Sequence, residues 1–547
     1  MEHYLKIFES TLKKNWSKTA VCNYQGECFT FSEMAEHIEK FHIFFEKAGI
    51  REHEHITLCA KNTARWAVSF FAINTYPAVV VSLLSDFTPD GICTLVDHSE
   101  STVLFVDTDI WEKLDITRMP RIKAVVSVNE FKLLYCSEDS ICEAFDGTQS
   151  EFDARHPKGL KPDDVHYNIG DIKEIGVINY TSGTTSAPKG VILRSECISA
   201  ICDFTLGAIP NDNSNKIVSM LPMGHIYGLV IEFMYSILSG SQVYFLGKTP
   251  SPTLLVKALQ DVRPFIIITV PLVMEKIYKS SIKPILSKRL VKVLTHTPWI
   301  SRIIYRKIGQ KMMASFGGNV QHIIMGGAAL NPEVERTLMK AGVPIFVGYG
   351  MTEAAPLLTF EYWYNFKAGS CGKPIPCCDI RIDSEDPQRI AGEIQAKGPN
   401  ICSGYFNNPE ASANAFTEDG YLHTGDLGII DKNGNLFIKG RSKNMILSAN
   451  GQNIYPEELE AVINNEPFIS ESVVVDRGGK LVALIVLDEA LIKRRRLRKA
   501  DIAAIPENAR VNANLQLPTY SQIAKTEVMS EPFAKTPKMS IKRFLYK

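Results

Sequence analysis

Short runs rich in valine and isoleucine recur through residues 1–440, and they constrain the fold of this 547-residue chain more than any other feature. Examples are HITLCA, STVLFVD, KAVVSV, KIVSML, SQVYFLG, FIIITV, VQHIIMGG and VPIFVGYG. Continuous apolar runs of this length are typical of strands that are buried on both faces, and here helical segments separate them. This order predicts an α/β fold with layered subdomains built on parallel sheets.

A change in sequence character near GRSKN, residues 440–444, marks a second unit. The residues that follow are more charged and contain the runs SVVVDR and KLVALIVLD, which are typical of strands. About a hundred residues are enough for a small separate domain. We therefore predict a large N-terminal domain of layered α/β subdomains over residues 1–440 and a small α+β C-terminal domain over residues 441–547.

The charge balance and the cysteine spacing argue against several classes of protein. Sixty Lys and Arg residues balance sixty Asp and Glu residues, so no overall field marks a nucleic-acid binder. The twelve cysteines include no CxxC pair and show no regular spacing. They predict reduced, mostly buried thiols in a cytoplasmic protein, rather than a disulfide framework or a zinc site.

One uncharged run, WAVSFFAINTYPAVVVSLLS at residues 66–85, is long enough to cross a bilayer. Asn74, Thr75 and Pro77 interrupt its centre. We expect a helix to about Ile73, a break at Pro77 and then a buried strand, rather than a membrane span. The opening segment MEHYLKIFESTLKKNW carries charges throughout and predicts no secretory signal.

The basic run KRRRLRK, residues 493–499, has two interpretations. Most runs of this kind form the solvated face of a helix. The alternative is a site for an anionic ligand or an acidic membrane surface.

The segment YTSGTTSAPKG, residues 180–190, has the composition of an anion-binding loop. Glycine lets the backbone approach a ligand closely, and successive backbone N–H groups can hold a phosphate. The loop adds hydroxyl groups, a glycine turn and one ammonium group, from Thr181, Ser182, Gly183, Thr184, Thr185 and Lys189. The apolar flanks IGVINY and GVILRS predict a hairpin with this loop at its tip.

Three interpretations of this segment compete. A P-loop requires glycine directly before the lysine and Ser or Thr after it, whereas here Pro188 precedes Lys189 and Gly190 follows it. A plain polar hairpin turn is the second interpretation, because Gly, Ser, Thr and Pro dominate turns. The third, a nucleotide loop of another type that closes over a triphosphate, fits the two flanking strands best.

Three further motifs contain groups that suit a nucleotide. In VGYGMTEAAP, Tyr349 offers a flat face, and Glu353 is a carboxylate that suits Mg²⁺ beside phosphate oxygens. The motif IMGGAALNPEV predicts a strand that ends at Gly327, followed by a helix, and leaves backbone edges where a base can lie. In YLHTGDLGIID, Asp426 is either a turn residue or an acceptor for two ribose hydroxyls.

Seven segments stand in one order along the chain: YTSGTTSAPKG, LPMGHIYG, GGAALNPEV, GYGMTEAAP, SGYFNNPEAS, HTGDLG and GRSKNMILSANGQNIYPEELE. In this order they resemble the adenylate-forming superfamily of acyl-CoA synthetases, acyl-adenylating ligases and luciferase-like enzymes. The similarity runs from FTFSEMAEHIEKF near the N-terminus to KRFLYK at the end. The basic, apolar segment from about Lys276 to Phe316 most resembles the long-chain fatty-acid CoA ligases.

The resemblance implies a two-step reaction with ATP, Mg²⁺ and coenzyme A. A carboxylate attacks the α-phosphate to give an acyl-adenylate and pyrophosphate, after which the small C-terminal domain, which is mobile in the family, swings. The thiol of coenzyme A then attacks the acyl carbon.

The resemblance also implies a role for individual residues. The β- and γ-phosphates would be held by Thr181, Ser182, Gly183, Thr184, Thr185 and Lys189, and Mg²⁺ by Thr184 and Glu353. The remaining nucleotide contacts would come from Gly327, Ala328, Tyr349, Gly350, Thr352, Asp426 and Arg441, of which the last two take the ribose. His225 would lie by the acyl carboxylate, and Lys443 would be the hinge of the small domain.

One departure from the family lies near the C-terminus. The family's catalytic lysine has a setting that resembles Arg/Lys-Thr-x-x-x-Lys-x-x-Arg, whereas the matching segment KTPKMSIKR has Ser540 in the lysine position. Lys538 and Lys542 lie two residues to either side, on the same face of an extended segment. We expect one of them to take over catalysis, because a phosphate needs a nearby positive charge. Otherwise the protein performs a half-reaction or only binds nucleotide.

Together these features predict an ATP-dependent ligase that activates a medium- or long-chain fatty acid to its coenzyme A thioester. Two alternatives stay open: a ligase that loads an acyl carrier protein, and a non-catalytic nucleotide- or acyl-binding protein. We expect a cytoplasmic location and no nucleic-acid partner. Peripheral contact with the inner face of the membrane would suit a fatty substrate, although neither a lipidation motif nor a clear amphipathic anchor in the sequence supports it.

Overall fold

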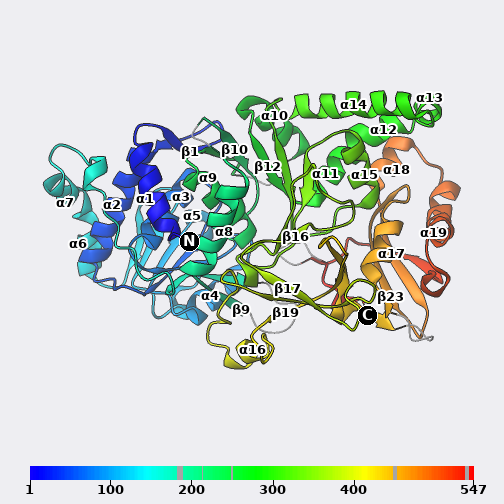
Figure 1. Cartoon of the computed structure of the whole chain (residues 1–547). Helices are drawn as coiled ribbons and strands as arrows, with labels where there is room; N and C mark the ends of the chain where they lie inside the picture. The colour runs from blue at the N-terminus through cyan, green and yellow to red at the C-terminus, as the bar shows by residue number, and fades with distance from the viewer. Residues whose placement is uncertain (182–188, 212–213, 248–250, 448–452, 536–540, 547) are drawn as a thin grey trace.

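The computed structural model of the chain describes residues 1–547 except 182–188, 212–213, 248–250, 448–452, 536–540 and 547. Two large, mostly parallel sheets form the N-terminal part (Figure 1). The eight apolar runs predicted as strands are confirmed, because each contains a strand of one of these sheets. The α/β fold class is therefore confirmed.

The first sheet has the strand order β7-β6-β5-β3-β4-β8-β9. Its strands are β3 (His55–Cys59), β4 (Val79–Ser82), β5 (Val103–Val106), β6 (Ala124–Ser127), β7 (Leu133–Cys136), β8 (Ile175–Thr181) and β9 (Lys189–Arg194). Neighbouring strands are parallel except for the antiparallel pairs β6–β7 and β8–β9. The β8–β9 pair confirms the predicted hairpin, and the phosphate-binding role of the loop between the two strands stays a prediction.

The second sheet has the order β14-β13-β12-β10-β11-β1-β2 and is parallel except at β1–β2. Its strands are β1 (Thr19–Asn23), β2 (Cys28–Thr30), β10 (Lys216–Ser219), β11 (Gln242–Phe245), β12 (Ile266–Thr269), β13 (His322–Met325) and β14 (Ile345–Val347). Because β10, β12, β13 and β14 are parallel neighbours, the loops that follow them lie at one edge of the sheet.

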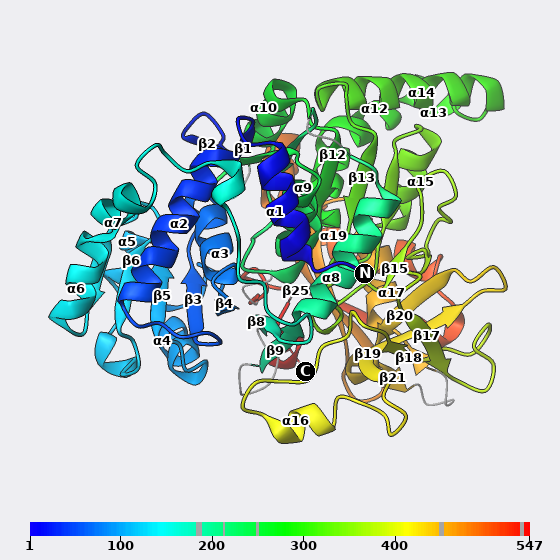
Figure 2. The same ribbon diagram turned by 60° about the vertical axis from the view of Figure 1, so that its left-hand side comes forward.

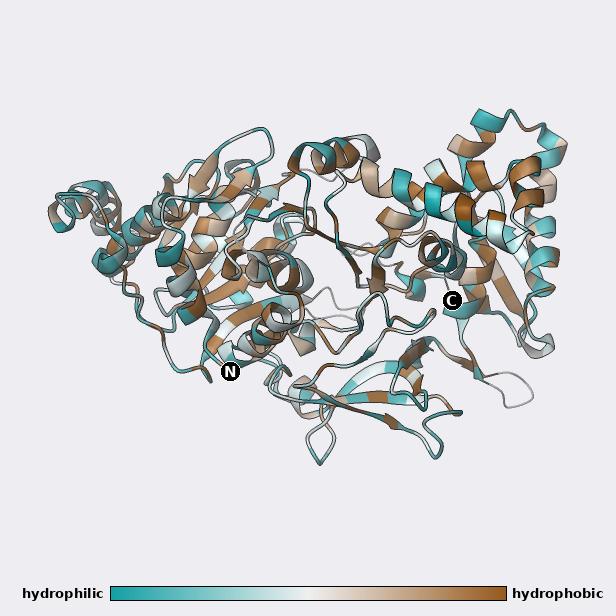
Figure 3. Cartoon of the chain, turned by 45° about the horizontal axis from the view of Figure 1, so that its top comes forward, coloured by the Kyte–Doolittle hydropathy of each residue, from teal (hydrophilic) through white to brown (hydrophobic). Residues whose placement is uncertain are grey.

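Helices connect the strands of both sheets (Figure 2). Those used below are α1 (Tyr4–Lys14), α2 (Phe31–Lys47), α3 (Ala64–Asn74), α6 (Asp139–Asp146), α8 (Ser195–Ala208), α10 (Pro252–Val262), α11 (Pro271–Ile277), α13 (Arg289–Leu294), α14 (Pro298–Ser315) and α15 (Pro332–Lys340). A capping box of Thr30 and Glu33 begins α2. Figure 3 shows apolar residues concentrated on the strands and on the helix faces that cover them.

The uncharged run at residues 66–85 folds as predicted. Helix α3 ends at Asn74, and the buried strand β4 follows from Val79. Trp66, Phe70 and Phe71 of α3 are fully buried in the main hydrophobic core, which explains why the run carries no charge. Among the described residues, no helix has the length and apolar character that a membrane crossing requires.

A four-stranded antiparallel sheet leads into the C-terminal part. It contains β17 (Asp379–Asp383), β18 (Gly392–Lys397), β19 (Leu422–Ile430) and β20 (Leu436–Arg441). The following unit contains α17 (Pro456–Ile463), β23 (Ile469–Asp476), β24 (Leu481–Leu487), α18 (Glu489–Arg495), α19 (Lys499–Asn514) and β25 (Lys525–Val528). This smaller α+β unit has its own hydrophobic cluster, in which Leu459, Ile485 and Ala509 are buried. A domain boundary at residues 440/441 stays a prediction.

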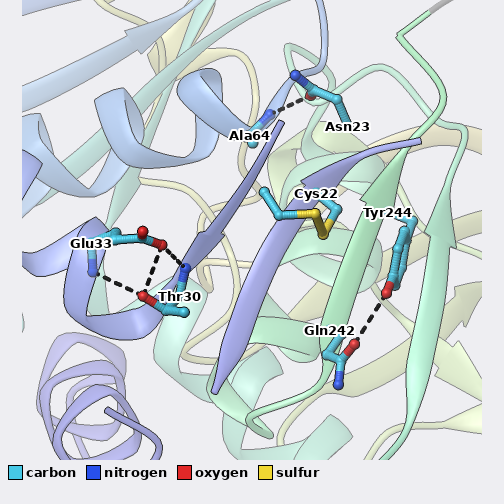
Figure 4. Close-up of a disulfide and its surroundings, with 8 residues drawn as sticks. Cys22, Asn23, Thr30, Glu33, Ala64, Gln242 and Tyr244 are labelled. Atoms are coloured by element: carbon cyan, nitrogen blue, oxygen red, sulfur yellow. Dashed lines mark hydrogen bonds between the residues drawn. A yellow bond between two sulfur atoms is a disulfide. The ribbon is translucent and has the colours of Figure 1, made fainter. Parts of the chain in front are cut away.

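The prediction of reduced cysteines is wrong for four of the twelve. Cys22 and Cys28 form a disulfide across the antiparallel β1–β2 pair, where they are direct partners with Cα atoms 4.0 Å apart (Figure 4). Cys136 at the end of β7 is bonded to Cys142 in α6. Both pairs are separated by six residues, a spacing that a hairpin or a strand-to-helix turn can close. The eight other cysteines are free, and all of them except the half-buried Cys377 are buried.

Candidate active site

The loop after β18 pairs with the end of the β8–β9 hairpin. Ile192 donates its N–H to the carbonyl of Gly404 over 3.0 Å, and Phe406 donates to the carbonyl of Gly190 over 2.7 Å. Between these bonds, Val191 forms an isolated antiparallel bridge with Tyr405. Two segments that are far apart in sequence, YTSGTTSAPKG and SGYFNNPEAS, are therefore neighbours.

Glu353 joins the same region from a third segment. It lies in the short 3₁₀ turn η5 (Thr352–Ala354), and its backbone carbonyl accepts a hydrogen bond from the N–H of Cys402. Tyr405 donates its hydroxyl to the Glu353 carboxylate over 3.0 Å. The Lys189 ammonium lies 4.7 Å from the centre of the Tyr405 ring. Tyr405 thus connects the proposed phosphate-binding lysine to the proposed metal-binding carboxylate.

The hydroxyl of Tyr405 stays protonated at physiological pH. Burial and the charge of Glu353 both raise the pKa of this phenol above its ordinary range. The hydroxyl therefore acts as a donor that orients the Glu353 carboxylate.

Most of the predicted phosphate loop lies outside the described residues, including Ser182, Gly183, Thr184 and Thr185. Thr181 is the last residue of β8, where its backbone is the partner of Lys189. The roles proposed for these loop residues, including that of Thr184 toward Mg²⁺, stay predictions.

A second cluster forms around Asp426 on β19. This carboxylate is only 6% exposed, and it accepts a hydrogen bond from the Tyr349 hydroxyl over 2.7 Å. The guanidinium of Arg441 on β20 lies 2.9 Å from its other oxygen. Burial raises the pKa of Asp426, and the charge of Arg441 opposes this effect. The structure thus unites three of the predicted nucleotide residues from strands and loops far apart in sequence.

The loops after β13 and β14 lie side by side next to this cluster, because the two strands are parallel neighbours. Gly327 has a φ of +84° and no atom near the position of a Cβ, and Ala328 is exposed. At Gly350, a Cβ would meet the Pro356 carbonyl oxygen at 1.7 Å, so only glycine fits there. Thr352 is buried. An open backbone edge beside the Tyr349 segment suits a flat base.

His225 lies on the loop that follows β10. The Nδ1 atom of His225 accepts a hydrogen bond from the Tyr227 N–H over 3.1 Å, and the ring is half-buried. Asn179 of β8 donates its side-chain amide to the neighbouring Gly224 carbonyl, and the Tyr227 ring packs on Gly326. The His225 loop therefore lies between the phosphate hairpin and the Gly327 segment.

Glu232 holds this loop from inside the core. It lies in the π-helix η3 (Tyr227–Met234) and is fully buried. Its carboxyl accepts hydrogen bonds from the Ser219 hydroxyl at 2.7 Å, the Met220 N–H at 2.9 Å and the Leu221 N–H at 3.1 Å. Burial raises the pKa of Glu232 to about 8, although these three donors favour the ionised form. A single buried carboxyl group thus fixes the end of β10 and the two residues that follow it, and Leu221 is four residues before His225.

Replacing Glu232 with glutamine is expected to lower turnover and to change how stability depends on pH. The new amide cannot accept from all three donors, and a buried donor left without a partner costs about 1–3 kcal/mol. The folded carboxyl keeps its proton up to about pH 8, whereas the unfolded chain releases it near 4.5. Wild-type stability should therefore fall relative to Glu232→Gln as the pH rises through this interval.

Thermal unfolding of both proteins between about pH 5 and about pH 8 measures this difference. The exposed Glu418→Gln variant is the control, for which the wild-type pH profile is expected. A Glu232→Gln profile parallel to that of the wild type would contradict the assignment.

The predicted roles of the C-terminal residues stay predictions. Lys443 is exposed in the 3₁₀ turn η6 (Ser442–Asn444), directly after β20. Lys538 and Ser540 lie outside the described residues. The backbone of Lys542 is bonded to Ala534, and the adjacent Arg543 forms an ion pair with Glu460 of α17. Within the described residues, no hydrogen bond or ion pair joins Lys542 to Glu353 or Asp426.

The donor groups suit a magnesium–nucleotide complex better than a bare metal ion. In the part of the chain that the structure describes, no group of three or more His, Cys, Asp or Glu side chains could hold a metal. Mg²⁺ needs only one or two carboxylates when phosphate oxygens and water complete its shell. Glu353 beside the phosphate hairpin meets that requirement.

Sequence reasoning missed two residues that matter in this region. Tyr405 was part of the motif SGYFNNPEAS, yet only its pairing with β9 reveals the contact with Glu353. Glu232 had a visible signal, because it is the one charged residue in the apolar run GLVIEFMYSIL. A lone acid in such a run is expected to be buried and hydrogen-bonded.

The fold and this site define an AMP-binding enzyme. A family model described as AMP-binding enzyme matches residues 8–406, and a model described as AMP-binding enzyme C-terminal domain matches residues 443–546. The chain therefore belongs to the AMP-binding enzyme family.

Relatives at modest identity include long-chain fatty-acid CoA ligases. The chain is 26% identical to the long-chain-fatty-acid–CoA ligase FadD15 of Mycobacterium bovis, covering 94% of this chain and 89% of that protein. It is 27% identical to the long-chain-fatty-acid–CoA ligase 1 of Cavia porcellus, covering 89% and 76%. Among solved structures, the anthranilate CoA ligase AuaEII in complex with anthranoyl-AMP superposes with a TM-score of 0.80 at 19% identity, over 100% of this chain and 96% of that one. This last likeness supports the fold alone.

Proposed function

We propose that this protein is an ATP-dependent acyl-CoA synthetase that activates a medium- or long-chain fatty acid to an acyl-adenylate and then to its coenzyme A thioester. The observation that carries this reaction is the meeting of the β8–β9 hairpin with Glu353 through Tyr405. The choice of acid rests on the long-chain-fatty-acid–CoA ligases to which the chain is 26% and 27% identical.

Apolar side chains of the core lie next to the proposed acyl site. Met220 donates its N–H to Glu232, and Thr269 accepts a hydrogen bond through its carbonyl from the Tyr227 hydroxyl over 3.2 Å. The loop of His225, where the acyl carboxylate would lie, is therefore next to an apolar part of the core.

The other residues have separate tasks in this proposal. Lys189 and the hairpin loop would hold the β- and γ-phosphates, which leave as pyrophosphate. Glu353, oriented by Tyr405, would hold Mg²⁺, which neutralises charge on the phosphates. Asp426 and Arg441 would hold the ribose beside Tyr349. Residues 441–547 would turn about Lys443 between the two half-reactions.

Pyrophosphate release by the purified protein, with ATP, Mg²⁺ and a series of fatty acids, tests the proposal. Release that depends on the acid, and formation of the thioester only when coenzyme A is added, is the expected result. Thioester formation on an acyl carrier protein alone would favour the carrier-loading alternative. Release of free phosphate in place of pyrophosphate would contradict adenylation altogether.

Variants around Ser540 test whether a neighbouring lysine replaces the catalytic lysine of the family. We expect that Lys538→Ala or Lys542→Ala lowers pyrophosphate release about 100-fold, because one lysine supplies the charge that Ser540 cannot supply. We expect only one of these two variants to be affected. The other is the control, and its rate of pyrophosphate release should stay near that of the wild type. If wild type is inactive with every acid and Ser540→Lys is active, the protein is a nucleotide- or acyl-binding member that no longer adenylates.

The cellular location is a separate part of the proposal. The two disulfides remove the cysteine pattern as an argument for a cytoplasmic protein. A cytoplasmic location stays a proposal, and peripheral membrane contact would suit a fatty substrate.

A further inference from the structure

Helix α13 and the first half of α14 carry large apolar side chains on their solvent side. Leu290 is 71% exposed, Val293 68%, Trp299 67% and Ile303 48%. Leu290 and Val293 are three residues apart, and Trp299 and Ile303 are four apart, so each pair lies on one helix face. Large exposed apolar groups this close in sequence mark a surface that contacts something other than water.

The core of the protein does not need these side chains. Helix α14 packs through its second half, where Ile308, Gly309 and Met312 are buried. A Cβ at Gly309 would meet the Ala341 carbonyl oxygen at 2.0 Å, so α14 lies close against the end of α15. In Figures 1 and 2, α14 and α13 lie along the top edge of the molecule.

The same segment is strongly basic. Residues 276–311 contain no Asp or Glu, although the whole chain has sixty acidic and sixty basic residues. Their basic residues are Lys276, Lys279, Lys283, Lys288, Arg289, Lys292, Arg302, Arg306, Lys307 and Lys311. Within the described residues, the ion pair of this segment is that of Lys283 with Glu333 at 3.4 Å. The positive charge is therefore largely uncompensated by the protein itself.

We propose that residues 288–307, the α13–α14 surface, dock the protein onto a membrane that contains anionic lipids. Cationic side chains would bind the lipid headgroups, and Leu290, Val293 and Trp299 would enter the boundary with the acyl chains. Charge complementarity alone would also suit a nucleic acid, but exposed aliphatic side chains and a tryptophan fit a lipid interface. Docking does not require the ligase activity, although it would bring the protein to a source of fatty acids.

A second basic run in the chain provides a matched contrast. Residues 493–499 are as basic, but Lys493 lies 3.8 Å from Glu489, and Arg498 forms an ion pair with Asp501 at 3.0 Å. Leu497 is the apolar residue of the run, and it is half-buried. The run has charge without an exposed apolar face, so it is not expected to dock.

Co-sedimentation of the full-length protein with lipid vesicles tests the proposal. Wild type should bind vesicles of phosphatidylcholine with phosphatidylglycerol and not vesicles of phosphatidylcholine alone. The variants Leu290→Ser/Val293→Ser/Trp299→Ser and Lys288→Gln/Arg289→Gln/Lys292→Gln should each lose binding about tenfold or more. The controls Leu515→Ser/Val528→Ser and Arg494→Gln/Arg495→Gln/Lys499→Gln should bind as wild type does.

Two further measurements separate insertion from adsorption. Brominated lipids should quench part of the tryptophan fluorescence of wild type, and Trp299→Phe should lose that part. Pyrophosphate release without vesicles should be unchanged in all four combined variants. Vesicle binding itself does not depend on ligase activity, so the co-sedimentation test holds even if the wild type is inactive.

The proposal is overturned if wild type does not bind anionic vesicles or if the control variants lose binding equally. It is also overturned if only the charge variant loses binding, which would indicate adsorption without insertion. A third outcome would assign the surface to nucleic acid instead. In that case the wild type binds a short DNA duplex tightly and does not bind vesicles, and the same charge variant loses the DNA binding.

Discussion

Replacing Asp426 with alanine is expected to lower kcat/KM for ATP by roughly 100- to 10,000-fold. The proposed ribose contacts are two hydrogen bonds to a charged acceptor, each worth about 1.5–3 kcal/mol. The carboxylate is buried and bound by Tyr349 and Arg441, so alanine also leaves those two groups without this partner. Initial rates of pyrophosphate release over a range of ATP concentrations give the value.

Two variants serve as comparisons for Asp426→Ala. Asp426→Asn keeps the shape and one acceptor, so an intermediate loss is expected. Asp419 lies near the same antiparallel sheet but is exposed and paired with Arg381 at 2.5 Å, and Asp419→Ala should leave kcat/KM for ATP unchanged. A threefold or smaller effect of Asp426→Ala, in a protein that melts at the wild-type temperature, would exclude Asp426 from the nucleotide site.

Replacing Glu353 with glutamine is expected to reduce kcat by roughly 100- to 1,000-fold and to move the Mg²⁺ dependence to higher concentrations. Glutamine can still accept the Tyr405 hydrogen bond, so the local fold is kept while the charge that binds the metal is lost. A Mg²⁺ titration of pyrophosphate release measures both effects.

Tyr405→Phe tests the orientation of the Glu353 carboxylate and is expected to lower kcat about tenfold.

Glu361→Gln is the control for Glu353→Gln and should leave kcat unchanged. Glu361 is a buried acid too, but it is paired with Lys373 at 3.0 Å. An unchanged Mg²⁺ dependence in Glu353→Gln would mean that the metal is held by other groups.

The strands of the two large sheets could be predicted from the sequence because their signal is local. A buried parallel strand must be apolar along its whole length, and residues such as Ile266–Thr269 show this without any knowledge of their neighbours. The break in the run at residues 66–85 was equally local, since Pro77 cannot continue a helix. The order of the strands within each sheet carried no such signal.

The candidate site could be predicted where a motif has a chemical requirement of its own. The glycine at position 350 is such a case, because a Cβ there would meet the Pro356 carbonyl. The ion pair of Asp426 with Arg441 came only from the structure, and their contact with a ribose stays a prediction. The takeover by Lys542 stays untested, since its neighbour Arg543 is paired with Glu460 and Lys538 lies outside the described residues.

The sequence by itself determined the α/β class, the strand positions, the phosphate hairpin and the residue types that a nucleotide needs, because each follows from short-range backbone and side-chain preferences. Only the tertiary structure decided which distant groups meet: Tyr405 with Glu353, Glu232 with the end of β10, and Cys22 with Cys28. It also decided which apolar residues stay outside the core, as Trp299 does. Which groups pair depends on contacts between segments far apart in the chain, and no local pattern encodes these pairings.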